Sequence, residues 1–463
     1  MYSAIIHTLG CKLNQLESEA IASAFTQAGF KLLSETSNDS TTLHIINTCT
    51  VTSKADQKAR RIIRKTLRDN PNSCVLVTGC YAELDPQEIK ALETELAGET
   101  NDYGSNKQRL FVFKGKDKGG LLELPSYLKE TKKSGAALCN LIRTWSESSQ
   151  TREQKLFMPA QFSFHSRAFI KIQDGCDRHC TYCRVCLARG PSYSISAEQI
   201  LNELKSLEEK GYAEAVLTGV NITQYQYNEE CKDLSELIKY LLAGTKRIAL
   251  RLSSLDPDRI DKKFVLALSD KRVRPHFHLS IQSGSVKILS LMGRSYSSDT
   301  VKRAVSLLRS VKEDPFLACD IITGFPGETE TDFEDTLNLC KAIDFAWIHV
   351  FSYSKRPGTP AFSFPDPVCE RDAVKRALSL QDLAKQGRRN YAKRWLGRKV
   401  TVIIEKGKNE PSFCRGITEN YLKILVRCNG EAPLSGSVIN CLLLEIPDEK
   451  IYKDDVDVIG EEV

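Results

Sequence analysis

The chain has 463 residues, of which 41% are hydrophobic and 27% charged, and this excludes both a disordered protein and a chain too short to bury a core. Its 65 basic and 59 acidic residues leave a formal charge of +6, which by itself indicates neither a nucleic acid nor a membrane as partner. The first residues, MYSAIIHTLG, lack a targeting signal, and no apolar run reaches the roughly 20 residues of a membrane span. We therefore expect a cytoplasmic protein whose 16 cysteines serve metal binding, catalysis or packing rather than disulfide bonds.

The chain length predicts more than one domain, and the sequence pattern divides it into three. In the first, residues 1–122, short apolar runs alternate with amphipathic stretches, which predicts a small α/β domain with a parallel sheet. We expect its strands at residues 4–8, 43–47 and 75–78, and its helices near residues 17–28 and 54–68. Residues 123–163 are polar and weakly periodic, and we predict a partly irregular linker there.

The second predicted domain, residues 164–393, repeats a strand-then-helix rhythm six times. This rhythm predicts a parallel, partial (β/α)6 barrel, in which functional residues lie on the loops after the strands. We expect its strands at residues 169–173, 213–217, 248–252, 276–281, 317–322 and 347–351. In the third domain, residues 394–463, the apolar runs are short and separated by Gly, Pro and Asn, which predicts a small all-β, OB-like module.

The loop after the first barrel strand, DGCDRHCTYCRVCLARG at residues 174–190, contains four cysteines and is called the cysteine loop below. Cys176, Cys180 and Cys183 form a C-x3-C-x2-C pattern, whereas the last two of these and Cys186 form C-x2-C-x2-C. A ferredoxin-type run would need a further cysteine before the next proline, where Gly190 stands instead. A structural zinc site commonly takes two separated pairs of ligands, so this crowded loop does not favour zinc.

Three thiolates on a four-iron cluster leave one iron open to a small molecule, which is the chemical sense of the C-x3-C-x2-C pattern. With this loop placed after the first strand of a barrel, the sequence resembles the radical S-adenosylmethionine (SAM) superfamily. The resemblance implies that Cys176, Cys180 and Cys183 hold a 4Fe-4S cluster whose open iron binds SAM, and that Cys186 is not a ligand. In that superfamily an electron from the cluster cleaves SAM to a 5′-deoxyadenosyl radical.

Small or polar residues at the predicted strand ends are candidate SAM contacts. The resemblance implies that Tyr182 flanks the adenine of SAM. Gly219 in LTGVNI would let a ligand approach the backbone, although a turn after a strand needs a glycine in any case. Ser253, Gln282 and Ser283 follow later strands, where a polar side chain either contacts a ligand or caps the next helix. We expect no catalytic residues beyond the cluster ligands.

Cys11, Cys49 and Cys80 each follow one predicted strand of the first domain, in TLGC, INTC and VTGC. Because the carboxyl ends of parallel strands share one edge of a sheet, these three thiols would meet in space. Free cysteine is commonly buried, and we assign the other cysteines, Cys74 and Cys139 among them, to packing. A cysteine triad in front of a radical SAM barrel resembles the methylthiotransferases, and this resemblance implies an auxiliary 4Fe-4S cluster on Cys11, Cys49 and Cys80.

The predicted helix after Cys49 carries a row of exposed basic residues on one face. These are Lys54, Lys58, Arg61, Lys65 and Arg68. A solvated helix usually mixes charges of both signs, so this face favours contact with the phosphates of RNA over simple solvation. The third domain resembles the TRAM domain, an RNA-binding barrel, and Phe413 and Tyr421 are candidate rings for stacking on bases.

Within the methylthiotransferases, TLGCKLNQLESEA and INTCTVTSKADQKARRIIRK resemble the branch that modifies threonylcarbamoyladenosine at position 37 of tRNA. The deciding residues are Lys12, Leu13 and Asn14, directly after the first cysteine. In the branch acting on isopentenyladenosine, Gln-Met-Asn stands at this place. In the branch acting on an aspartate of a ribosomal protein, Pro-Lys-Asn stands there.

The resemblance implies a transferase that uses two 4Fe-4S clusters and SAM to insert a methylthio group at carbon 2 of threonylcarbamoyladenosine. The partners it implies are the anticodon stem-loop of tRNA and an electron donor such as flavodoxin or ferredoxin, and neither a membrane nor DNA is expected. The other two branches are alternatives. A non-catalytic iron-sulfur protein that binds RNA is a further alternative from a different class.

Overall fold

The computed structural model describes residues 2–33, 42–99, 108–131, 137–148, 157–229, 231–406, 412–428, 433–448 and 456–463. Contacts divide the chain into two compact units. Unit 1 comprises Met1–Ser163 and Cys183–Pro191, and unit 2 comprises Phe164–Tyr182 and Ser192–Val463. Among the described residues, no helix is both long and apolar enough to cross a membrane.

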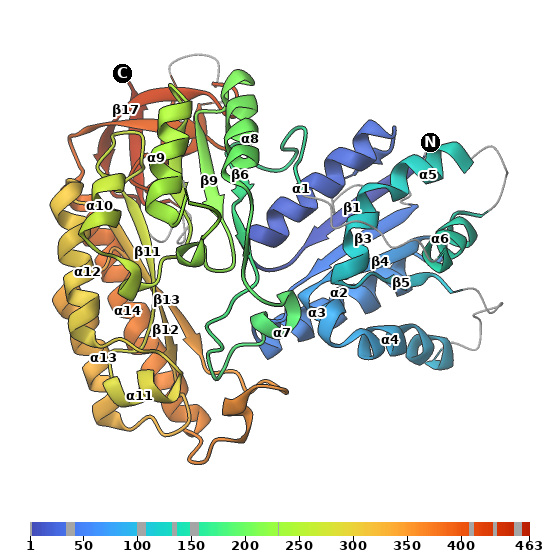
Figure 1. The fold of residues 1–463 in the computed structure, drawn as a ribbon, viewed down its shortest axis with the longest axis horizontal. Helices are drawn as coiled ribbons and strands as arrows, with labels where there is room; N and C mark the ends of the chain where they lie inside the picture. Colours follow the sequence, from blue (N-terminus) through green and yellow to red (C-terminus); the bar gives the residue numbers. More distant parts are fainter. Residues whose placement is uncertain are drawn as a thin grey trace. The chain divides into compact units, whose positions relative to one another are not determined.

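Unit 1 is built on a parallel five-stranded sheet in the order β2-β1-β3-β4-β5 (Figure 1). Its strands are β1 (Ser3–Thr8), β2 (Lys31–Leu32), β3 (Leu43–Thr48), β4 (Cys74–Gly79) and β5 (Leu110–Val112). Its helices are α1 (Lys12–Gln27), α2 (Ser53–Asp69), α3 (Cys80–Leu84), α4 (Pro86–Glu99), the 3-10 helix η1 (Gly115–Leu122), α5 (Leu124–Thr131), α6 (Leu138–Glu147) and α7 (Val185–Arg189). The predicted α/β class is confirmed, and the three predicted strands are β1, β3 and β4.

Helices cover both faces of this sheet because successive strand residues point to opposite sides. On β3, Ile45 packs with Phe25 of α1 and Trp145 of α6 in one apolar core. The next residue, Ile46, packs with Ile63 of α2 in a second core, to which α4 also contributes. Helices on both faces explain why every residue of β3 and β4 is buried, rather than every second one.

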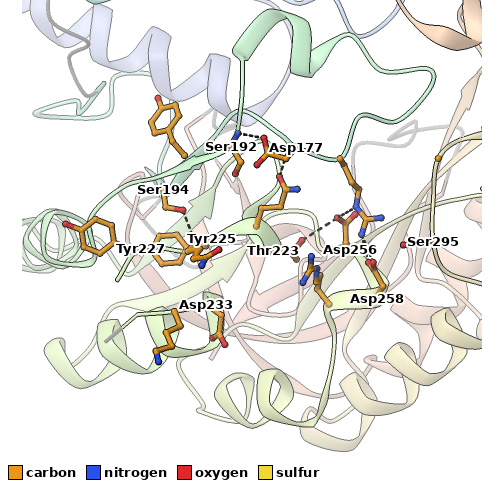
Figure 2. Close-up of a pocket in the computed structure, with 17 residues that line it drawn as sticks. Asp177, Ser192, Ser194, Thr223, Tyr225, Tyr227, Asp233, Asp256, Asp258 and Ser295 are labelled. Carbon is orange, nitrogen blue, oxygen red and sulfur yellow. Dashed lines mark hydrogen bonds and ion pairs between the residues drawn. The ribbon is translucent and has the colours of Figure 1, made fainter. Parts of the chain in front are cut away.

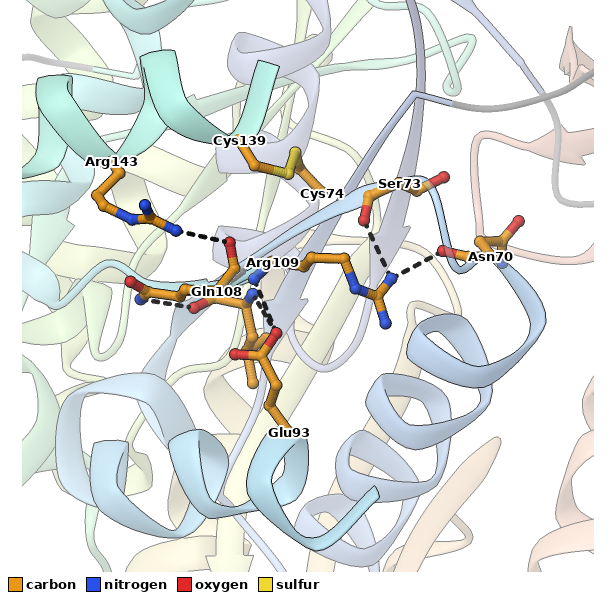
Figure 3. Close-up of a disulfide and its surroundings, with 9 residues drawn as sticks. Asn70, Ser73, Cys74, Glu93, Gln108, Arg109, Cys139 and Arg143 are labelled. Carbon is orange, nitrogen blue, oxygen red and sulfur yellow. Dashed lines mark hydrogen bonds between the residues drawn. A yellow bond between two sulfur atoms is a disulfide. The ribbon is translucent and has the colours of Figure 1, made fainter. Parts of the chain in front are cut away.

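A disulfide joins Cys74, at the start of β4, to Cys139 of α6, with 5.8 Å between the two Cα atoms (Figure 3). The assignment of both residues to packing as free thiols is therefore wrong, although both do pack in the core beneath α6. A pairing across 65 residues leaves no signal in the spacing of cysteines. Beside it, Arg109 donates hydrogen bonds to the carbonyls of Asn70 (3.0 Å) and Ser73 (3.3 Å), which fixes the turn before β4.

Unit 2 contains two parallel three-stranded sheets, β10-β9-β6 and β11-β12-β13, linked by bridges from Leu250 to Val273 and from Leu255 to Leu279. The six strands are β6 (Ala168–Lys171), β9 (Glu214–Thr218), β10 (Ala249–Leu252), β11 (His276–Gln282), β12 (Phe316–Thr323) and β13 (Trp347–Ser352). A short hairpin joins β7 (Gln173–Asp174) to β8 (Tyr193–Ser194). The strands lie where the sequence places them, and the partial barrel is confirmed.

Helices follow these strands in the expected alternation (Figure 1). The α-helices are α8 (Ala197–Glu209), α9 (Leu234–Gly244), α10 (Lys262–Leu268), α11 (Val286–Leu291), α12 (Ser298–Val311), α13 (Glu330–Ile343) and α14 (Glu370–Arg394). The 3-10 helices are η3 (Ile222–Gln224), η4 (Pro257–Arg259) and η5 (Pro360–Ser363). Side-chain caps begin several of them: Ser196, Asp233 and Thr329 each accept a hydrogen bond from a backbone N–H of the first turn.

A closed five-stranded barrel, β14-β15-β16-β18-β17, completes unit 2 and matches the predicted OB-like module. Its strands are β14 (Lys399–Ile404), β15 (Phe413–Thr418), β16 (Lys423–Arg427), β17 (Val438–Glu445) and β18 (Val458–Glu462). One apolar core includes Phe316 of β12, Trp395 after α14 and Val402 of β14. This barrel is therefore packed onto the (β/α) barrel rather than tethered beside it.

A buried ion cluster strengthens the same junction. The carboxylate of Glu214 accepts hydrogen bonds from Arg251 (2.7 and 2.8 Å) and from Arg274 (3.0 Å). Arg251 also donates to the carbonyls of Thr418 and Glu419 in the closed barrel. Arg251 and Glu214 are both 0% exposed, so the cluster is a fixed structural joint.

Candidate functional site

The carboxyl edge of the unit 1 sheet carries three cysteines. β1 pairs with β3 as far as Thr8, and β3 pairs with β4 as far as Gly79, so the three strands end level with one another. The residues at this edge are Cys11, which caps α1, Cys49, which follows β3, and Cys80, which begins α3. Parallel topology thus brings together the three residues predicted to hold the auxiliary cluster.

These thiols lie close together. A Cβ built on Gly10 would lie 2.5 Å from the Cβ and 2.9 Å from the Sγ of Cys49. Burial, and to a smaller extent the neighbouring Cys11 and Cys80 thiols, raise the pKa of Cys49 to about 12. The pKa of Cys11 is also raised, by desolvation within the turn although the residue is exposed at the surface, and the Cys80 thiol adds to this rise. A cluster binds thiolates and so stabilises such a site by replacing the protons.

The three thiols can be compared with the ligand sets of a single metal ion and of a four-iron cluster. Among the described residues, no group of three or more His, Cys, Asp or Glu side chains is arranged to hold one metal ion. A four-iron cluster places its cysteine ligands on different irons, which spaces the sulfurs further apart than one ion does. Three thiols at one sheet edge are the number that a three-cysteine 4Fe-4S site needs and one fewer than the four ligands of a structural zinc site, and their assignment as cluster ligands stays a prediction.

Two features fix the turns that carry these cysteines. Gly10 (φ +105°) and Gly79 (φ +97°) adopt a backbone conformation that favours glycine, and a Cβ on Gly79 would lie 2.2 Å from the carbonyl oxygen of Thr48. The side chain of Asn14 donates to the carbonyls of Leu9 (2.7 Å) and Thr48 (2.9 Å), one on each of two neighbouring strands. Asn14 thus joins the Cys11 turn to the Cys49 turn.

An arginine that the sequence analysis missed lies in this network. The segment Cys183–Pro191 packs with unit 1, and its Arg189 donates to Oδ1 of Asn14 (2.9 Å) and Oε1 of Glu17 (3.2 Å). Its side chain is 9% exposed. Because Arg189 is distant in sequence from the residues it contacts, no local pattern could have identified it.

In unit 2, the cysteine loop begins after β6 with Cys176, which is half-buried, and Cys180, which is buried. Burial raises the pKa of Cys176, and the Cys180 thiol adds to this rise. Thr181 holds the loop through hydrogen bonds to the carbonyls of Met292 (3.1 Å) and Leu291 (2.7 Å). Cys183 follows three residues after Cys180 along the chain, as the C-x3-C-x2-C pattern requires, and it is the first residue of the segment assigned to unit 1. That these three cysteines hold one cluster stays a prediction.

Asp256 is the hub that ties this loop to the barrel, and the sequence analysis missed it. Its Oδ2 accepts from Arg178 (2.8 Å) and Asn221 (2.7 Å), and its Oδ1 accepts from Arg294 (2.9 Å). Arg294 also donates to the hydroxyl of Tyr182 (3.0 Å). One carboxylate after β10 therefore holds the loop at two places, at Arg178 directly and at Tyr182 through Arg294.

The predicted SAM contacts lie at or just beyond the carboxyl ends of their strands. They are Tyr182 in the loop, Gly219 after β9, Ser253 after β10, and Gln282 and Ser283 at the end of β11. A Cβ on Gly219 would lie 2.9 Å from the carbonyl oxygen of Gln173, so close packing already requires this glycine. The Ser283 hydroxyl lies 3.2 Å from that of Thr336, and Gln282 adopts a positive φ of +71°. Contact of these five residues with SAM stays a prediction.

Polar side chains line part of the barrel below these strand ends. The Ser254 hydroxyl lies 2.6 Å from Nδ1 of His278, and Nε2 of that ring lies 3.1 Å from Oδ1 of Asp320. The second of these contacts has the distance of an ion pair but not the angle of a hydrogen bond. His349 packs edge-on against His278, with 5.1 Å between the ring centres. A lone histidine within a strand gave no sign of this arrangement.

A polar cavity of about 830 Å3 adjoins the cysteine loop (Figure 2). Asp177 and Arg178 of the loop line it, together with Thr223 and Tyr225 after β9 and Asp256 after β10. Figure 2 shows Asp177 close to Ser192 at one end of this wall, where Ser192 donates its N–H to the aspartate at 2.9 Å. The volume lies within the range of small-ligand sites, roughly 300–1,000 Å3.

The predicted basic face of α2 is exposed on unit 1. Its members are Lys54, Lys58, Arg61, Lys65 and Arg68, and all five are exposed. Two further arginines of α2 point instead toward α4, where Arg60 pairs with Glu88 (3.1 Å) and Arg64 with Glu95 (2.8 Å). The helix therefore separates cations that serve packing from cations that face solvent.

Tyr421 is not an available stacking ring, and its prediction as one is wrong. Its ring stacks on His276 with 3.8 Å between the ring centres, and the Arg251 guanidinium lies 5.1 Å from its centre. Tyr421 lies in the turn between β15 and β16, and the sequence of that turn does not show that residues of the (β/α) barrel cover its ring. Phe413 is half-buried and packs against a small apolar core that includes Leu425.

Residues 170–340 match the Radical SAM superfamily, and residues 3–98 match "Uncharacterized protein family UPF0004". The threonylcarbamoyladenosine tRNA methylthiotransferase MtaB of Treponema pallidum (strain Nichols) is 39% identical, over 94% of this chain and 97% of its own. MtaB of Bacillus subtilis (strain 168) is 32% identical, over 96% and 94% of the two chains. The tRNA-2-methylthio-N(6)-dimethylallyladenosine synthase of Clostridium novyi (strain NT) is 30% identical, over 94% and 92%.

Proposed function

Because the chain belongs to the radical SAM methylthiotransferase family, we propose that it inserts a methylthio group at carbon 2 of threonylcarbamoyladenosine at position 37 of the tRNA anticodon loop. The enzyme is a transferase that uses SAM and 4Fe-4S clusters. When bound, these groups supply radical activation of a C–H bond and the sulfur and methyl groups of the product. The higher identity to the MtaB relatives than to the dimethylallyladenosine synthase carries the choice of nucleoside.

In this proposal the residues divide into two ligand sets. Cys176, Cys180 and Cys183 hold the cluster that binds SAM, and the hydrogen bonds centred on Asp256 support them by holding the loop. The auxiliary cluster takes Cys11, Cys49 and Cys80, whose convergence at one sheet edge is the supporting observation. We place the enzyme in the cytoplasm with its tRNA, where a flavodoxin or ferredoxin would supply electrons.

Nucleoside analysis of tRNA tests the substrate. In a strain that lacks this protein, we expect the 2-methylthio derivative of threonylcarbamoyladenosine to disappear and the unthiolated nucleoside to accumulate, as measured by liquid chromatography and mass spectrometry. Loss of the methylthio group from isopentenyladenosine, or from a ribosomal-protein aspartate, would assign the chain to another branch. Failure of the reduced protein to form 5′-deoxyadenosine from SAM would favour the non-catalytic alternative.

Iron and sulfide counts test the two ligand sets. After anaerobic reconstitution we expect about eight irons per chain, as two four-iron clusters require. A variant in which the three cysteines of either ligand set are replaced by Ala should retain about four irons per chain. A wild type with about four irons, lost only when Cys176, Cys180 and Cys183 are replaced, would reduce the first triad to packed thiols.

The exposed face of α2 is proposed to contact tRNA phosphates. Each lost phosphate contact lowers the slope of log affinity against log salt by roughly 0.7–0.9. Replacing Lys58, Arg61 and Lys65 by Ala should therefore lower that slope by about 2 or more in tRNA-binding titrations. Arg64→Ala on the same helix is the matched control, because Arg64 pairs with Glu95 of α4, and an equal effect per residue would contradict the assignment.

A further inference from the structure

We propose that Arg189 is a positioning residue of the auxiliary-cluster site, which fixes the Cys11 turn and raises the reduction potential of the cluster held there. The inference rests on the proposed ligand role of Cys11, Cys49 and Cys80. It concerns a residue from the same loop that carries the other ligand set, six positions after Cys183.

The contacts of Arg189 are specific. Its guanidinium bridges Asn14 (Nη2 to Oδ1, 2.9 Å) and Glu17 (Nη1 to Oε1, 3.2 Å), both on the first turns of α1. Asn14 in turn ties the carbonyls that precede Cys11 and Cys49, and the Sγ of Cys11 lies 3.9 Å from its Oδ1. Arg189 also interacts electrostatically with the Cys11 and Cys49 thiols. Several contacts therefore hold the Arg189 side chain beside Cys11 and Cys49.

The charges around this turn give the sign of the effect. Glu17 lies between two cations, since it pairs with both Arg189 and Lys118. The three side chains are 9%, 4% and 8% exposed for Arg189, Glu17 and Lys118, so water screens them weakly. Together they carry one net positive charge, which favours the more negative, reduced form of a nearby cluster.

Removing the charge of Arg189 and removing the charge of Glu17 should therefore shift the reduction potential in opposite directions. Removing the charge of Arg189 leaves Glu17 and Lys118 balanced, and the reduction potential should fall. Removing the charge of Glu17 leaves two cations, and the potential should rise. A purely structural role for Arg189 would change cluster content or stability but would not produce this reversal.

The experiment uses the full chain with Cys176, Cys180 and Cys183 replaced by Ala, so that only the auxiliary cluster remains. Each variant is reconstituted anaerobically, its iron is counted, and its potential is measured by redox titration followed by electron paramagnetic resonance. The variants are Arg189→Gln, Arg189→Lys, Glu17→Gln and Arg109→Gln. Arg109 is the matched control, because it is an arginine of unit 1 at the opposite, amino end of β4, where it binds backbone carbonyls.

We expect a lower potential in Arg189→Gln, a higher one in Glu17→Gln, and values near the parent in Arg189→Lys and Arg109→Gln. Unchanged potentials, or shifts of the first two variants in the same direction, would overturn the inference. If Arg189→Gln loses its iron, Arg189→Lys decides: a parent-like potential supports the role of charge, and loss of the cluster there too overturns it. A parent without iron would overturn the proposed ligand set as well, which separates the two failures.

Discussion

Asp256→Asn is the substitution that most directly tests how unit 2 holds the cysteine loop. The native carboxylate is 4% exposed and accepts hydrogen bonds from Arg178, Arg294 and Asn221. Asparagine keeps the shape but removes the charge, and its amide N–H would face arginine guanidinium groups, which can only donate. Breaking a buried ion pair by changing one partner costs about 3–5 kcal/mol. At roughly 2 °C per kcal/mol for a large domain, the Tm of unit 2 should fall by roughly 6–10 °C.

Calorimetry measures the predicted fall in Tm, and iron analysis measures whether the loop still holds its cluster. In a chain whose Cys11, Cys49 and Cys80 are replaced by Ala, Asp256→Asn should also lower the iron retained by the cysteine loop. Asp258→Asn is the control, because Asp258 is 23% exposed and accepts from Arg178 at 2.6 Å, so its loss should cost about 1 kcal/mol. If the two variants have the same Tm and the same iron content, the reasoning that Asp256 is the hub is wrong.

Three further predictions concern other parts of the chain. Gly10→Ala should abolish the auxiliary cluster in iron analysis, because its methyl would lie 2.5 Å from Cys49 Cβ, whereas Gly29→Ala, with φ +87° but nothing within 4 Å, should retain it. Burial alone would raise the pKa of Glu214, but the opposing effect of Arg251 is larger, and the pKa falls from the ordinary 4.5 to about 2. The ionised carboxylate therefore stabilises the fold fully above pH 4.5, and this stabilisation is lost as the pH falls toward 2. Glu214→Gln should accordingly flatten the acid side of a plot of Tm against pH. Cys74→Ser should destabilise unit 1 by about 4 kcal/mol, the chain-entropy value for its 65-residue loop. Dithiothreitol should lower the Tm of the wild type as well, and a wild type insensitive to it would contradict the disulfide.

The sequence predicts the backbone well because strands and helices are encoded by local patterns. All six barrel strands and three strands of the unit 1 sheet lie where short apolar runs place them. What it does not predict are side-chain contacts between distant segments. Arg189 meets Asn14 across 175 positions, and Arg294 meets Asp256 across 38. The Cys74–Cys139 pair and the covered ring of Tyr421 are failures of the same kind, since each depends on a contact with a distant segment.

The two proposed ligand sets are encoded in different ways, whereas neither code reaches the side chains that surround them. In the cysteine loop the spacing of Cys176, Cys180 and Cys183 is itself the site, so a single inserted residue would change the ligand geometry. At the unit 1 edge, spacing along the chain carries no information, because the level ends of β1, β3 and β4 bring the thiols together. Insertions in the segments between those strands would leave the edge intact as long as the sheet forms. Neither cysteine spacing nor strand order predicts the charge of Arg189 at this second site, because Arg189 comes from a distant part of the sequence.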